Sequence, residues 1–228
     1  MKVVLFSDGH GNLERLEQLA PQFREADLVL YGGDFAAFGD PETGLPYLER
    51  LAALHDQVFA VSGNCDPPDF RDTLEQYDMG IEGSLSYFNG LMLAGSGGAS
   101  HFKGDTPFER DDEELASDLH IAAEGLGGPA RQDNLVIIAH NPPKDTALDL
   151  VAPDVHVGSP RIREFIEQYQ PLLVLSGHIH ESAAVDRIGE TVLVNPGSLA
   201  LGQWAEAELL RENGVWKVAD IQLKSLIG

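Results

Sequence analysis

Short, continuously apolar runs recur along the chain, and each is followed by glycine and polar residues. A run that is apolar at every position is typical of a strand buried on both faces of a sheet. We therefore predict five buried strands, at residues 3–6, 28–31, 58–61, 135–139 and 172–176.

Apolar residues with helical spacing lie between several of these runs. Residues that recur every three or four positions form one face of a helix, which can pack against a sheet. The sets are Leu13, Leu16 and Leu19; Leu45, Leu48, Leu51 and Leu54; and Ile162, Phe165 and Ile166. We predict a helix around each set.

The middle and the last third of the chain carry hairpin signals. Asn89-Gly90 lies between two apolar stretches, and Asn213-Gly214 separates the last two strand-like segments. Asn-Gly in such a setting is a strong hairpin signal. Alternating strands and helices first, with antiparallel strands later, predict a mixed, layered α/β fold. Repeats and linkers are absent from the sequence, so we interpret residues 1–228 as a single domain.

Composition narrows the class of protein. A chain of 228 residues with 43% hydrophobic residues can bury a large core. The N-terminus has no apolar run after a basic start, and no stretch approaches the roughly 20 apolar residues of a membrane span. The single cysteine, Cys65, rules out an intrachain disulfide. We expect a cytoplasmic protein, since a lone cysteine fits a reducing compartment.

The charge is strongly negative. Lys and Arg number 15 against 37 Asp and Glu, which gives a net charge of −22. Such a surface repels nucleic acid and anionic membranes, because binding to either needs clustered basic residues. We therefore expect neither as a partner. The acidic cluster Glu109–Glu114 is typical of a solvated loop or of the first turn of a helix.

Polar side chains that can bind metals follow all five predicted strands. In open α/β sheets, ligands bind beyond the carboxyl ends of the strands, so these side chains are expected to meet. In strand order they are Asp8 and His10; Asp34; Asn64; His140; and His178 and His180.

Carboxylate oxygen and neutral imidazole suit divalent Mn, Fe, Zn or Ni. Seven groups are too many for one ion but suit two ions about 3.5–4 Å apart that share a bridging carboxylate. Two such ions lower the pKa of a bridging water towards roughly 7 and so supply a hydroxide. The reaction that this arrangement suits is in-line displacement at phosphorus.

The blocks "DGH", "GGD", "GNCD", His140 and "GHIH" together resemble the calcineurin-like metallophosphoesterases, and "NPGS" at Asn195–Ser198 extends the match. Two longer stretches, Gly95–Phe108 and Ser159–Glu181, resemble the bacterial and archaeal branch called Icc-related phosphoesterases. The resemblance covers most of the chain.

The resemblance implies a four-layer α/β/β/α sandwich of two mixed β-sheets flanked by helices. It also implies that Asp34 bridges two divalent ions, with Mn or Fe favoured and Zn or Ni as alternatives. The expected activity is hydrolysis of a small phosphodiester, or of a phosphomonoester, with Asp34, Asn64 and His178 taking part directly. By resemblance, Asp8, His10 and His180 hold the first ion, and Asn64, His140 and His178 hold the second.

One position departs from the family pattern. Cys65 stands where the family often has a histidine that helps to protonate the leaving group or contacts the phosphate. A thiol is a poorer acid at neutral pH than an imidazolium, so we hypothesise a preference for good leaving groups or the use of another acid. Asn12, Cys65 and His101 are the candidates for contact with the substrate, although for Asn12 we favour a helix cap.

Three other functions are weighed against this interpretation. Cys65 and Arg71 have the Cys-x5-Arg spacing of cysteine-dependent phosphatases, but Pro67 and Pro68 lack the N–H groups that such a phosphate loop needs. A binding scaffold that has lost catalysis is disfavoured, because all seven expected ligands are present. A nuclease is disfavoured by the net charge of −22. The sequence leaves the oligomeric state and the natural substrate open.

Overall fold

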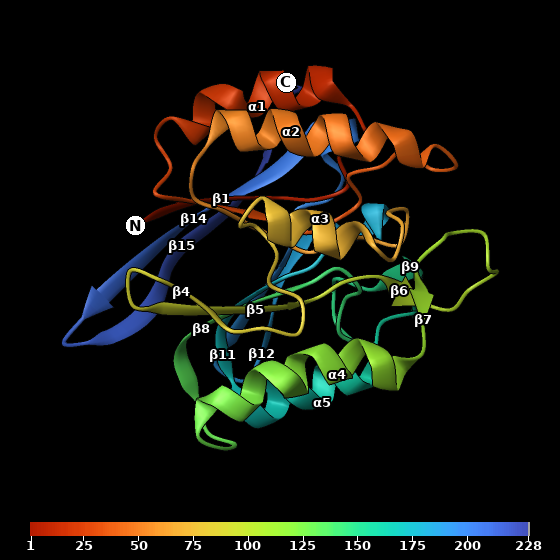
Figure 1. Ribbon diagram of the computed structural model, residues 1–228. Helices are drawn as coiled ribbons and strands as arrows, with labels where there is room; N and C mark the ends of the chain where they lie inside the picture. The colour runs from red at the N-terminus through yellow and green to blue at the C-terminus, as the bar shows by residue number, and fades with distance from the viewer. Residues whose placement is uncertain (228) are drawn as a thin grey trace.

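The computed structural model describes residues 1–227, in which two mixed β-sheets face each other and helices cover both outer faces (Figure 1). The first sheet has the strand order β15-β14-β1-β2-β3. Strands β1, β2 and β3 run parallel to one another. The long β14–β15 hairpin pairs with β1 through β14, which runs antiparallel to it. The bounds are β1 (Lys2–Phe6), β2 (Leu28–Tyr31), β3 (Val58–Ala60), β14 (Gln203–Glu212) and β15 (Val215–Ser225).

The second sheet has the strand order β12-β13-β11-β8-β5-β4. Its four central strands are parallel, and an antiparallel strand closes each edge. The bounds are β4 (Ser86–Phe88), β5 (Leu91–Ser96), β8 (Gln132–Ala139), β11 (Pro171–Leu175), β12 (Ala184–Ile188) and β13 (Thr191–Asn195).

The helices form the two outer layers, with α1, α2 and α3 over the first sheet and α4 and α5 over the second (Figure 1). The α-helices are α1 (Leu13–Phe23), α2 (Gly44–Leu54), α3 (Phe70–Gln76), α4 (Asp112–Ala123) and α5 (Pro160–Tyr169). The 3-10 turns are η1 (Pro41–Thr43), η2 (Glu124–Leu126), η3 (His180–Ser182) and η4 (Leu199–Leu201). Two small pairs complete the fold, β6 (Ala99–Ser100) with β7 (Glu109–Arg110) and β9 (Leu150–Ala152) with β10 (Val155–His156).

Three apolar layers hold the four structural layers together. Along β1, Val3 and Leu5 point into the layer between the sheets, whereas Val4 and Phe6 pack under α1 and α2. The strands β8 and β11 alternate in the same way between the inner layer and the layer under α4 and α5. Continuous apolar runs are needed because both faces of each strand are buried. The predicted four-layer sandwich is confirmed.

The predicted elements agree closely with those observed. All five buried strands are present, with ends that differ from prediction by at most three residues. Both hairpins are also present, and their turns have positive φ at Asn89 and Gly90 and at Asn213 and Gly214. A two-residue turn of type I′ requires this conformation at both positions, which is why Asn-Gly signals it.

The acidic cluster at Glu109–Glu114 belongs to β7 and to the first turn of α4, where Asp111 and Glu114 form a capping box. Within residues 1–227, none of the helices is both long and apolar enough to cross a membrane.

We expect truncation of the layer between the sheets to destabilise the whole fold. Leu93 on β5 is completely buried there, so Leu93→Ala should lower the free energy of unfolding by about 2–5 kcal/mol. The control is Leu201→Ala, since Leu201 is 59% exposed and its truncation should cost less than about 0.5 kcal/mol. Urea unfolding followed by circular dichroism measures both, and equal losses would contradict the assigned core.

Candidate metal centre

The seven expected ligands meet at one end of the sandwich. Each follows the carboxyl end of a parallel strand: β1, β2 and β3 of the first sheet, and β8 and β11 of the second. The two sheets face each other, so the polar ends of strands from both sheets converge. Sequence reasoning predicted this convergence from the strand-end positions alone.

Asp8, His10 and His180 form the first group. The Nε2 atoms of the two histidines lie 3.2 Å apart, and Nε2 of His180 is 3.0 Å from Oδ1 of Asp8. Nδ1 of His10 donates to the carbonyl of Ala36 at 3.2 Å, which leaves Nε2 with its lone pair. Facing acceptor atoms repel one another unless a proton or a cation lies between them. This donor set therefore fits a divalent cation.

His140 and Asn64 form a second such pair. Nδ1 of His140 donates to the carbonyl of Gly32 at 2.7 Å, so Nε2 carries the lone pair in the neutral ring. This Nε2 faces Oδ1 of Asn64 at 2.9 Å, although both atoms are acceptors. The amide turns its Nδ2 towards the sulfur of Cys65 at 3.8 Å instead. A cation would relieve the opposition of the two acceptors.

Asp34 lies between the two groups and is almost completely buried. Its Oδ2 is 3.7 Å from Nε2 of His10, and its Oδ1 is 3.6 Å from Nε2 of His140. The N–H of Cys65 donates to Oδ1 at 2.8 Å and fixes the carboxylate. The two oxygens of this carboxylate thus point to different groups, which is compatible with a bridging ligand.

Asp8 also approaches both groups, but its oxygens are engaged differently. The backbone N–H of His178 donates to Oδ1 and Oδ2 of Asp8 at 3.1 and 3.2 Å. The ring of His178 lies beside that of His140, with 5.4 Å between the centroids. His178 thus comes to the second group from the same loop that brings His180 to the first.

The protonation states suit metal binding. Burial, with the nearby charge of His140, lowers the pKa of His178 to about 4, so this imidazole is neutral at pH 7. Burial acts to raise the pKa of Asp8, but the hydrogen bond from His180 and the charges of the surrounding histidines lower it overall. For His180, burial lowers the pKa, and the hydrogen bond to Asp8 reverses this to a net rise. Asp8 is therefore ionised at neutral pH, and its negative charge favours the protonated form of His180.

Four of the candidate ligands adopt a backbone conformation that is rare outside glycine. The φ angles are 55° at Asp8, 47° at His10, 61° at Asp34 and 67° at His178. Such residues cost on the order of 1–3 kcal/mol each and gather at functional sites, where the surrounding structure enforces them. The positive φ angle changes the direction of the chain after each strand and directs the side chain towards the other candidate ligands.

Two glycines allow the backbone to approach the carboxylates. A Cβ at Gly63 would lie 2.0 Å from Oδ1 of Asp34, and one at Gly177 would lie 2.5 Å from Oδ2 of Asp8. No side chain fits at either position. This explains why glycine precedes Asn64 in one loop and His178 in another.

Other polar side chains hold the loops in place. Ser198 Oγ donates to the carbonyl of Asp8 at 2.8 Å, and Asn195 Nδ2 donates to the carbonyl of Ile179 at 2.8 Å. The hydroxyl of Tyr31 donates to the carbonyl of Asp34 at 2.8 Å. Sequence reasoning missed Tyr31, whose one signal was a hydroxyl at the end of a buried strand.

Asp66 orients the loop that carries Asn64. Its carboxylate accepts the backbone N–H groups of Phe35, Ala36 and Gly63 at 3.2, 2.7 and 2.8 Å. Burial and the charge of Asp34 raise the pKa of Asp66 to about 7, against the lowering effect of these N–H groups. The loops after β2 and β3 are thereby tied together.

A cavity of about 880 Å³ opens above the candidate ligands. Cys65 and His101, two of the three expected substrate contacts, line it. His101 lies on the loop between β6 and β7, with its ring nitrogens 3.7 Å from Glu109 and 3.5 Å from Asp111. The third candidate, Asn12, uses its Oδ1 to accept the N–H of Arg15 at 3.1 Å and so caps α1.

The surroundings of Cys65 oppose a cysteine-dependent phosphatase. Burial and the charge of Asp34 raise the pKa of the thiol far above its usual range, so the reactive thiolate is scarce. Arg71, which would bind the phosphate in such an enzyme, donates instead to the carbonyl of Glu82 at 3.5 Å.

A comparison with known protein families supports the chemistry of this site. The family model described as calcineurin-like phosphoesterase matches residues 1–182. The chain belongs to this family. Members typically bind a dinuclear metal site, and the described residues contain three groups of Asp, His and Cys side chains that could hold an ion. Membership indicates a hydrolase that acts on phosphorylated substrates. The narrower placement in the Icc-related branch stays a prediction.

Individual relatives agree with the fold. The uncharacterized protein MJ1162 of Methanocaldococcus jannaschii is 34% identical over 203 residues, which cover 86% of this chain and 88% of the relative. The crystal structure of TT1561 of Thermus thermophilus has 17% identity and a TM-score of 0.69, covering 99% of this chain and 98% of that one. A dimetal phosphatase from Danio rerio has 12% identity and a TM-score of 0.60, with 99% of each chain covered. The two structures show that the fold is shared.

We expect Cys65 to be unreactive in the folded protein. Alkylation by iodoacetamide needs the thiolate, which the raised pKa suppresses, so the native protein at pH 8 should react at least about tenfold more slowly than the unfolded chain. Mass spectrometry of quenched time points measures both rates. Equal rates would contradict the assigned surroundings of Cys65.

Proposed function

We propose that this chain is a dinuclear metal-dependent phosphoesterase that hydrolyses a small phosphodiester. The observation that carries the proposal is the position of Asp34, whose two carboxylate oxygens face His10 and His140 at 3.7 and 3.6 Å. A bridging carboxylate between two histidine-containing groups is the arrangement that two-metal phosphoryl chemistry requires.

The proposed ligand sets divide along the two groups. Asp8, His10 and His180 serve the first ion, Asn64, His140 and His178 serve the second, and Asp34 serves both. The mixed nitrogen and oxygen donors favour Mn or Fe, with Zn and Ni as alternatives. When bound, the ions supply Lewis-acid stabilisation of phosphoryl oxygens and lower the pKa of water.

The residues of the chain supply orientation and a fixed charge pattern. Gly32 and Ala36 accept the Nδ1 protons of His140 and His10, so both rings present Nε2 to the site without rearrangement. Asn64 and His178 are neutral, and both line the cavity in which the phosphate would lie. They are placed to stabilise the negative charge that grows on phosphoryl oxygens during in-line displacement.

We prefer a diester with a good leaving group. A monoester carries one negative charge more, and the chain has a net charge of −22. The thiol of Cys65 is a very weak acid, because burial and Asp34 raise its pKa, so it cannot easily protonate a poor leaving group.

The first test is hydrolysis of bis(4-nitrophenyl) phosphate by the purified protein with Mn²⁺. Asp34→Asn should lower kcat/KM at least about a hundredfold, because loss even of an outer partner of a metal ligand costs 10–100-fold. The control is Asp220→Asn, since Asp220 is an exposed carboxylate on β15 and its variant should retain the activity. Turnover that survives in Asp34→Asn would refute the bridging role. Absence of turnover in the intact, metal-loaded protein would favour a binding scaffold.

A second test addresses the leaving group. Cys65→His places an imidazole beside the site, and general acid catalysis contributes about 10²–10⁴-fold where a proton must be transferred. We expect at least a tenfold rise in kcat for a diester with an alkyl leaving group, and little change for a 4-nitrophenyl leaving group. Cys65→Ser controls for loss of the thiol. If Cys65→His changes kcat equally for the alkyl and the 4-nitrophenyl leaving groups, Cys65 does not determine the preference for good leaving groups.

A further inference from the structure

The cavity above the candidate metal centre is much larger than a phosphate group needs. Its volume is about 880 Å³, which approaches the upper end of pockets that enclose whole drug-sized ligands. The candidate ligands occupy one part of its lining. The remainder comes from the segment after Asp34, the loop between β6 and β7, and the region of the β9–β10 hairpin.

This remaining lining is rich in apolar side chains, and two of them are exposed aromatics. Phe38 is 67% exposed and Phe102 is 80% exposed. Val151, Val157 and Ile179 line the same cavity. A single exposed phenylalanine is ordinary, but two that share one cavity with three aliphatic side chains form a surface that a ligand can cover.

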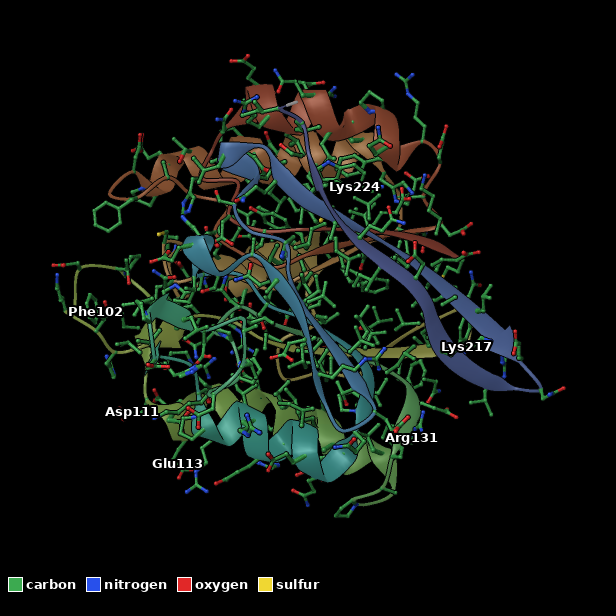
Figure 2. All side chains as sticks on the ribbon, turned by 180° about the vertical axis from the view of Figure 1, so that it is seen from behind. Phe102, Asp111, Glu113, Arg131, Lys217 and Lys224 are labelled. Atoms are coloured by element: carbon green, nitrogen blue, oxygen red, sulfur yellow. The ribbon has the colours of Figure 1, made fainter. Side chains whose placement is uncertain are left out.

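The loop that carries Phe102 is firmly built. Pairing of β6 with β7 closes its base. Within the loop, the carboxylate of Glu109 accepts the backbone N–H groups of Phe102, Gly104 and Thr106 at distances between 2.9 and 3.4 Å. Figure 2 shows Phe102 on this loop at one edge of the molecule, opposite the end where β15 carries Lys217. The backbone at Phe102 is therefore held in place before any ligand arrives, which reduces the loop entropy lost on binding.

The charges around the cavity disfavour a second anionic group on the ligand. Asp105, Glu109 and Glu181 line it, whereas Lys103 is the one lysine or arginine in its lining within the described part of the chain. The ammonium group of Lys103 lies 4.8 Å from the centre of the Phe102 ring and is engaged with it. Beyond the phosphate, the cavity therefore suits a group that carries no negative charge.

We propose that the cavity selects phosphate esters whose organic group is aromatic and carries no negative charge, with that group packed against Phe38 and Phe102. The inference rests on the proposed function, because it places the phosphate at the candidate metal centre. It adds the class of organic group that the same site accepts.

The test compares two ligands that differ only in the organic group. Phenylphosphonate and methylphosphonate carry the same charged head, and titration calorimetry with the Mn²⁺-loaded protein measures their dissociation constants. We expect phenylphosphonate to bind about tenfold more tightly, as aromatic contacts together with burial of the ring allow. In Phe102→Ala and Phe38→Ala this ratio should fall to about threefold or less, while methylphosphonate binds as before.

The control is Tyr87→Ala, because Tyr87 is an aromatic residue on β4 that is 68% exposed and lies outside the cavity lining of the described chain. It should leave the ratio unchanged. A kinetic readout accompanies the binding data: Phe102→Ala should raise KM for bis(4-nitrophenyl) phosphate about tenfold with kcat nearly constant, since a contact made equally in the ground and transition states is removed.

The two proposals fail in different ways. Two outcomes would overturn the aromatic preference but not the proposed metal centre. In one, phenylphosphonate binds no more tightly than methylphosphonate. In the other, the tighter binding of phenylphosphonate persists in both phenylalanine variants. If the metal-loaded protein binds neither phosphonate, the proposed function is overturned and the aromatic preference with it.

Discussion

The arrangement of this end of the protein depends on the convergence of nitrogen and oxygen atoms that can each accept a hydrogen bond or hold a cation. Oδ1 of Asn64 faces Nε2 of His140 at 2.9 Å, and Nε2 of His10 faces Nε2 of His180 at 3.2 Å. Partners that can only accept, the carbonyls of Gly32 and Ala36, fix the two ring orientations. Turning either ring would break its Nδ1 hydrogen bond, so this arrangement favours positive charge between the facing atoms.

Holding these atoms together strains the backbone, and the rest of the fold compensates for the strain. Four candidate ligands have positive φ angles, and glycine is required beside two of the carboxylates. Three extensive apolar layers and the hydrogen bonds of Tyr31, Asp66 and Ser198 offset that strain. The strained loops at the site thus depend on the extensive burial elsewhere, because their backbone conformations would not persist without the rigid sandwich beneath them.

Much of the fold and of the candidate site could be predicted from the sequence, for a physical reason. Strands buried on both faces must be apolar throughout, so a polar residue that follows one, such as Asp8 or His140, marks the strand end. Parallel strands then bring these ends to one edge. The hydrogen bond from Tyr31 to the carbonyl of Asp34 could not be predicted in this way, because no sequence pattern marks it. The loop that carries Phe102 follows no periodic pattern, since the scattered N–H groups that Glu109 accepts determine its shape.

The two parts of the site impose different requirements on a ligand. The convergent ligand atoms fit cations, which would in turn attract an anionic phosphoryl group, whereas the acidic and apolar remainder of the cavity disfavours further negative charge. In a chain with a net charge of −22, metal ions held by these residues would reverse the local field in favour of an anionic substrate. Attraction is confined to a few ångströms around Asp34, and a ligand with one phosphate and an uncharged remainder satisfies both constraints.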